Sequence, residues 1–167
     1  MKKTLSLLLL FVCGSAFAFD RSETDITVEN VIREMNAMRA ANGLPPLVVN
    51  GKLTRAAESR MQDMIDGEWW SHESPDGISP FVWLSATDYD YLYAAENLAA
   101  GFETSPVLVE AWMESPGHRA NIMGVQYSEC GIAIIDGSTK GRALGKSVVV
   151  LFGRQKTPML QHAARRP

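Results

Sequence analysis

Apolar residues recur at helical spacing in two stretches in the first half of the chain. The first stretch follows Thr27, a residue type that caps helix N-termini, and closes at Gly43. The second stretch closes at Gly67. Their apolar residues are Val28, Val31, Ile32, Met35 and Met38 in the first, and Leu53, Ala56, Ala57, Met61, Met64 and Ile65 in the second. The spacing predicts two amphipathic helices whose apolar stripes pack into a core.

The middle of the chain alternates between turn-forming and apolar segments. Gly, Pro, Ser and Asp between residues 69 and 80 predict a loop, and Phe81–Leu84 predicts a short helix after it. Tyr91–Leu98 is aromatic and apolar enough for a strand. Ser105-Pro106 predicts the start of another helix, which Pro116-Gly117 interrupts. The apolar face of that helix is expected to hold Val107, Leu108, Ala111 and Trp112.

Two β-rich runs follow near the C-terminus. Gly131–Ile135 and Ser147–Phe152 are apolar, and a polar, Gly-rich stretch separates them. This arrangement predicts an antiparallel hairpin with a long loop. Residues 154–167 show no periodicity, so we expect them to form a disordered tail.

The N-terminus has the pattern of a cleavable signal peptide. Lys2 and Lys3 precede an apolar run from Leu5 to Val12, and Ala16-Phe17-Ala18 forms a small-x-small cleavage site. The apolar run is shorter than the roughly 20 residues that a membrane-spanning helix needs, and no later stretch approaches that length. We therefore expect residues 1–18 to be removed, leaving one secreted or periplasmic domain from 19 to 153 without a transmembrane segment.

Charge and cysteine content exclude some kinds of partner and cross-link. The full chain has a formal net charge of −3. Without Lys2 and Lys3 the charge is about −5, which argues against nucleic acid, because phosphates require a basic surface. Cys130 is the single cysteine after the leader, so no intramolecular disulfide can form. Its apolar neighbours predict a buried, unreactive thiol.

Two histidines with nearby carboxylates are the candidates for chemistry. His72 and His118 lie among turn-forming residues, which predicts exposed imidazoles in loops, and Glu96 and Glu114 occur between them. Two histidines and one or two glutamates suffice for a divalent-metal site with an open position, or for general acid and base catalysis. The sequence contains neither G-x-S-x-G nor H-E-x-x-H, which disfavours a serine hydrolase and an ordinary zinc protease.

Three ordered motifs resemble those of bacterial CAP domains, the superfamily of cysteine-rich secretory proteins, insect venom antigens and plant pathogenesis-related proteins. They span Ser71–Gly77, Ala95–Ala99 and Trp112–Ile122. The resemblance implies an α+β fold, a three-layer α-β-α sandwich with a small antiparallel sheet and a surface cleft. Matched motif to motif, the cleft residues would be His72, Glu96, Glu114 and His118.

The resemblance further implies a cofactor. His72 and His118 would hold Zn²⁺ or another divalent ion, while Glu96 and Glu114 would lie near a metal-bound water. With two protein nitrogens as ligands, such a site would be weak and exchangeable. The chain lacks the several cysteines of animal and plant relatives, so activities tied to their cysteine-rich extension are not transferred.

Three function hypotheses are consistent with these residues. The preferred one is a non-catalytic, metal-assisted binding module for a lipid or another envelope component. The second is a metal-dependent hydrolase with Glu96 or Glu114 as the base. In the third, the four polar residues of the predicted cleft only stabilise the fold, while another surface binds a protein partner.

Overall fold

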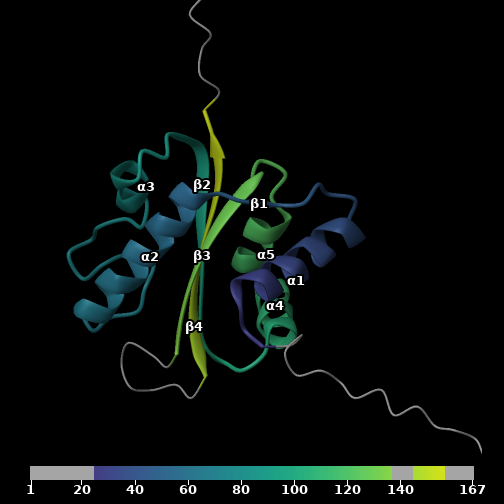
Figure 1. Ribbon diagram of the computed structural model, residues 1–167, viewed down its shortest axis with the longest axis horizontal. Coiled ribbons are helices and arrows are strands. Elements are labelled where there is room, and N and C mark those ends of the chain that lie inside the picture. The colour runs from purple at the N-terminus through teal and green to yellow at the C-terminus, as the bar shows by residue number, and fades with distance from the viewer. Residues whose placement is uncertain (1–24, 137–144, 157–167) are drawn as a thin grey trace, which may run out of the picture.

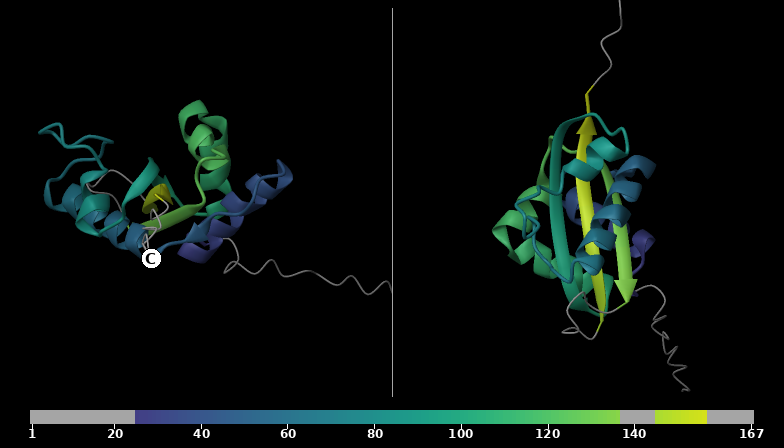
Figure 2. Two further views of the ribbon diagram at one scale, coloured as in Figure 1. Left: turned by 90° about the horizontal axis from the view of Figure 1, so that it is seen from above. Right: turned by 90° about the vertical axis from the view of Figure 1, so that its left-hand side faces the viewer.

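The computed structural model describes residues 25–136 and 145–156, which form three layers (Figure 1). Helices α2 (Gly51–Asp66) and α3 (Val82–Ala86) cover one face of a central sheet. Helices α1 (Val28–Ala41), α4 (Ser105–Glu114) and α5 (Pro116–Met123) cover the other face, as the two views of Figure 2 also show. The predicted α-β-α sandwich is confirmed.

The sheet has the strand order β1-β3-β4-β2. Strand β4 (Lys146–Gln155) pairs antiparallel with both β2 (Tyr91–Phe102) and β3 (Glu129–Asp136), which confirms the predicted hairpin. The two-residue strand β1 (Val48–Val49) pairs parallel with β3, so the sheet is mixed. Strand β4 reaches two residues beyond Gly153, where the predicted domain ended, and the predicted leader and residues 157–167 lie outside the described ranges.

Alternate residues of β4 build two separate cores. Val148, Val150 and Phe152 pack against the helices α1, α4 and α5. Val149 and Leu151 point to the opposite face and pack against α2 and α3. Because successive side chains of a strand point to opposite faces, a continuous apolar run such as Val148–Phe152 fits a strand that is covered on both sides.

The structure confirms the two long helices, and α1 begins directly after Thr27, as predicted. The Thr27 side chain accepts from Asn30 N at 3.1 Å and caps α1, and Asn50 Oδ1 accepts from Lys52 N at 2.9 Å and caps α2. Gly67 follows the last residue of α2. Side-chain caps satisfy N–H groups that the helix itself leaves unpaired.

The region around Pro116 differs from the prediction. We expected His118 to lie in a loop, but Pro116 begins α5 and His118 lies within that helix. Proline is tolerated in the first turn, because the N–H it lacks has no partner within the helix there. The predicted apolar face of α4 is also partly wrong, since Val107 is 54% exposed and Val109 is buried.

Cys130 is buried in the core beside α1, α4 and α5, as predicted. Its side chain has no exposed surface, and burial raises the pKa of the thiol to about 12. A thiol that stays protonated at neutral pH is a poor nucleophile and a poor metal ligand. Cys130 is therefore a packing residue.

Candidate functional site

Glu96 is the centre of a buried polar network on β2. Its side chain is 2% exposed, and each carboxylate oxygen has its own partner. Nδ1 of His72 donates to Oε1 at 2.9 Å, and Nε of Arg60 donates to Oε2 at 3.1 Å. A buried carboxylate requires such partners, because burial without them strongly penalises the charge. Glu96 therefore connects α2 to the loop that carries His72.

Arg60, from α2, binds the backbone of the loop that carries His72. Its Nη2 donates to the carbonyl oxygens of Ser71 at 2.7 Å and His72 at 2.9 Å. Its guanidinium carbon lies 4.6 Å from the ring centroid of Trp69 and 4.9 Å from that of Trp83, within cation–π range. The side chain has no exposed surface. Arg60 thus positions both the backbone of His72 and the carboxylate that orients its ring.

His118 lies opposite His72 on α5. The two ring centroids are 6.4 Å apart, and the Trp112 ring is also 6.4 Å from His118. Asn97 Nδ2 donates to the His118 carbonyl at 3.2 Å, so Asn97 bonds a backbone group beside the histidine pair. Asn121 Nδ2 donates to Asn97 Oδ1 at 2.9 Å and to the Glu96 carbonyl at 3.1 Å. These amides hold α5 against β2 and fix the separation of the histidines.

The two imidazoles have opposite electrostatic environments. The hydrogen bond to Glu96 raises the pKa of His72 above its usual value, and burial only partly offsets this. Burial lowers the pKa of His118, and the neighbouring His72 lowers it further. His72 is therefore protonated more readily than His118, and a neutral imidazole has a ring nitrogen that can accept a hydrogen bond or bind a metal.

In metal-free buffer we expect His72 to titrate above, and His118 below, the usual pKa of about 6.5. His72 then stabilises the fold below about pH 6.5, and this stabilisation is lost as the pH rises through the pKa of His72 in the folded state. His118 stabilises the fold above about pH 6.5, and this stabilisation is lost as the pH falls through the pKa of His118 in the folded state. Imidazole NMR resonances measure both titrations. Glu96→Gln should lower the pKa of His72, and an unchanged His72 titration in this variant, with His118 titrating as before, would contradict the assignment.

Comparison with known proteins identifies the family. Residues 32–152 match the CAP family, described as the Cysteine-rich secretory protein family. The match covers most of the chain, including the whole network described above. The chain belongs to the CAP family.

Relatives of this CAP domain occur in Bacillus subtilis. The uncharacterized protein YkwD is 35% identical over 108 residues, which are 65% of this chain and 42% of YkwD. The uncharacterized membrane protein YlbC is 28% identical over 99 residues, which are 59% of this chain and 29% of YlbC. The chain thus spans less than half the length of these two relatives.

Solved structures support the CAP fold. An extracellular protein containing an SCP domain from Bacillus anthracis has a TM-score of 0.64 and 23% identity, and the match covers 81% of this chain and 41% of that one. An outer surface protein from Borrelia burgdorferi has a TM-score of 0.66 and 21% identity, with coverages of 79% and 98%. At these identities the likeness establishes the fold.

Of the four residues that the resemblance to CAP domains singled out, the structure connects three. His72, Glu96 and His118 lie together, as described above. Glu114, the last residue of α4, is exposed, and its side chain makes no hydrogen bond or ion pair with another described residue. Arg60 was not predicted as a site residue, although it contacts Glu96 directly.

The donor set of the CAP domain limits what metal it can hold. Within residues 25–136 and 145–156, no group of three or more His, Cys, Asp or Glu side chains is arranged to bind an ion. His72 Nε2 and the ring of His118 supply two nitrogens, and Glu96 behind Nδ1 of His72 is the usual outer partner of a metal-binding histidine. Two imidazoles on one tetrahedral Zn²⁺ have ring centroids about 5 Å apart, so these rings would have to approach by about 1 Å.

Proposed function

We propose that this CAP domain is an extracytoplasmic binding module that takes up an envelope component, such as a lipid, at the pair His72 and His118. One observation carries the proposal. One carboxylate oxygen of Glu96 accepts a hydrogen bond from Arg60 and the other accepts one from His72. This bond orients the half-exposed His72 ring opposite His118 and leaves its Nε2 free of described partners. An oriented, accessible imidazole pair is suited to binding a ligand directly or through a shared metal.

A divalent ion would join the two histidines in this proposal. When bound, it would supply a Lewis-acidic centre whose remaining positions accept oxygen ligands such as lipid phosphate or carboxylate groups. Arg60 and Glu96 would hold the His72 ring in place, and the Asn97–Asn121 pair would hold α5 and His118. With two protein ligands, affinity for the ion would be modest.

Binding is preferred to hydrolysis because of how Glu96 is engaged. A general base needs a carboxylate oxygen within hydrogen-bond reach of the water it deprotonates. Both oxygens of Glu96 already bond to Arg60 and His72. Glu114, the other proposed base, is outside this network. The buried groups therefore support the histidines, and we assign them no catalytic step.

An extracytoplasmic location is part of the proposal. The leader pattern at residues 1–18 and the likeness to extracellular and outer-surface proteins support it. In the described ranges, none of the helices combines the length and the hydropathy that crossing a bilayer requires.

Zinc titration of the metal-stripped chain by isothermal calorimetry tests the metal site. We expect one ion to bind per chain, and the double variant His72→Ala, His118→Ala should lose this binding. Glu110→Gln is the control, because this exposed glutamate of α4 is outside the predicted cleft set and its side chain makes no described hydrogen bond or ion pair, and it should bind as the parent does. Equal zinc uptake by the parent and the double variant would contradict a metal at the histidine pair.

Vesicles test the ligand separately. Flotation with phosphatidylglycerol vesicles, with and without zinc, should recover more parent protein than double variant. If zinc binds but flotation is equal for both proteins, the metal site stands and the lipid headgroup is excluded as its ligand.

A further inference from the structure

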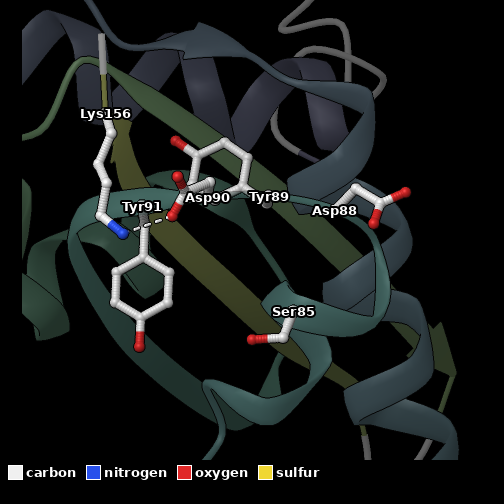
Figure 3. Close-up of a pocket in the computed structure, with 6 residues that line it drawn as sticks. All are labelled: Ser85, Asp88, Tyr89, Asp90, Tyr91 and Lys156. Carbon is white, nitrogen blue, oxygen red and sulfur yellow. Dashed lines mark hydrogen bonds and ion pairs between the residues drawn. The ribbon is translucent and has the colours of Figure 1, made fainter. Parts of the chain in front are cut away.

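A cavity lies at the N-terminal end of β2, where the connection from α3 enters the strand. Its volume is about 600 Å³, and it is lined by Ser85, Asp88, Tyr89, Asp90, Tyr91 and Lys156 (Figure 3). None of the histidine network residues lines it. The volume falls within the range of about 300–1,000 Å³ that is typical of small-molecule sites.

The walls of this cavity are held in place by hydrogen bonds. Tyr89, 1% exposed, donates its hydroxyl to Glu129 Oε2 at 2.7 Å, and Lys52 Nζ donates to the Asp88 carbonyl at 2.8 Å. Lys156 pairs with Asp90 twice, through Nζ to Oδ1 at 2.6 Å and through its backbone N–H to the Asp90 carbonyl at 2.9 Å. A site whose groups are already fixed loses little conformational entropy when a ligand binds.

The lining of the cavity has one more negative than positive group. Asp88 and Asp90 bring two carboxylates, and Lys156 brings one ammonium that is already paired with Asp90. In Figure 3 the Asp88 carboxylate points away from Tyr91 and Asp90. The space between Asp90, Tyr91 and Ser85 therefore carries little net charge, and an ionic ligand would gain little there.

The same space combines an aromatic surface with several hydrogen-bonding groups. Tyr91 is half-buried, and its ring, 6.0 Å from that of Phe81, stands beside the Asp90–Lys156 pair. Ser85 contributes a hydroxyl, Asp90 can accept hydrogen bonds and Lys156 can donate them, so the cavity offers both donors and acceptors. A pyranose ring has complementary features, because its C–H face packs on an aromatic ring while its hydroxyls both donate and accept.

We propose that this cavity binds a neutral saccharide, whose C–H face packs on Tyr91 while its hydroxyls bond to Ser85, Asp90 and Lys156. The site is independent of the histidine pair, so the domain has two separate binding regions.

Neutral tetrasaccharides of N-acetylglucosamine and of glucose are suitable probes, with binding measured by calorimetry and by saturation-transfer NMR. We expect at least one to bind the purified chain with saturation of its ring C–H protons, and Tyr91→Ala to weaken binding at least tenfold. Tyr93→Ala is the matched control, since Tyr93 is on the same strand, is 45% exposed and does not line the cavity.

Two results would overturn the saccharide site: no binding of either probe, or equal binding by the parent and Tyr91→Ala. The double variant His72→Ala, His118→Ala should bind the saccharide as the parent does. That measurement separates this site from the proposed metal site, because either can fail while the other stands.

Discussion

Arg60→Met is expected to lower the free energy of unfolding by about 3–5 kcal/mol, the usual cost of removing one partner of a buried ion pair. Methionine fills part of the same space, but it loses the cation–π contacts with Trp69 and Trp83 and leaves the buried Glu96 carboxylate without its guanidinium partner. The carbonyls of Ser71 and His72 also lose their donor. Urea unfolding, followed by tryptophan fluorescence, measures the change.

A double-mutant cycle measures the interaction energy between Arg60 and Glu96. The double variant Arg60→Met, Glu96→Gln removes both charges and should be more stable than the sum of the two single changes implies, because no unpaired charge remains. Additive losses would mean that Arg60 and Glu96 do not interact, which would contradict the role of Arg60 in holding the carboxylate that orients the His72 ring.

Gly131→Ala is expected to cost about 3 kcal/mol of stability through overpacking. A Cβ at this position of β3 would overlap the carbonyl carbon of Leu53 and the amide nitrogen of Thr54. Both atoms belong to the backbone of α2, so no side chain can turn aside to relieve the overlap. The helix itself would have to move away from the sheet.

Gly117→Ala is the matched control for that change. A Cβ at Gly117, in the first turn of α5, would have no neighbour within 4 Å. Alanine should be tolerated there within about 1 kcal/mol, because it is also the better helix former. Chemical denaturation of both variants makes the comparison, and equal effects would show that the contact between α2 and β3 is looser than described.

The periodic elements were predictable because packing against a sheet imposes a repeat on the sequence. The apolar stripes of α1 and α2, and the apolar runs of β3 and β4, face the two cores. Strand β1 was not predicted, since two residues are too few to show any alternation. Its pairing with β3 depends on a contact between segments about 80 residues apart.

Arg60 shows why part of the site was missed. It follows Ala56 and Ala57 and precedes Met61 and Met64 at helical spacing, so its position falls on the buried face of α2. A pattern that counts only apolar residues passes over a charge on that face. The signal was therefore present in the spacing, but its partner Glu96, 36 residues away, cannot be inferred from periodicity.

Glu114 and His118 are four residues apart in the sequence, but they do not lie on one helix. Residues four apart face each other only on a continuous helix. Here α4 ends at Glu114 and α5 begins at Pro116, so the helical repeat restarts between them. The family resemblance, and not the spacing, supplied His72, Glu96 and His118 as a set.

The buried Cys130 has a consequence for where this domain can fold. Cys130 is the single cysteine of residues 25–136 and 145–156 and is free, so this part of the chain contains no internal disulfide that an oxidase must form or a reductant can break. Folding of the described domain then does not require a particular redox potential in its surroundings. The compartment in which the domain folds does not have to supply oxidising power.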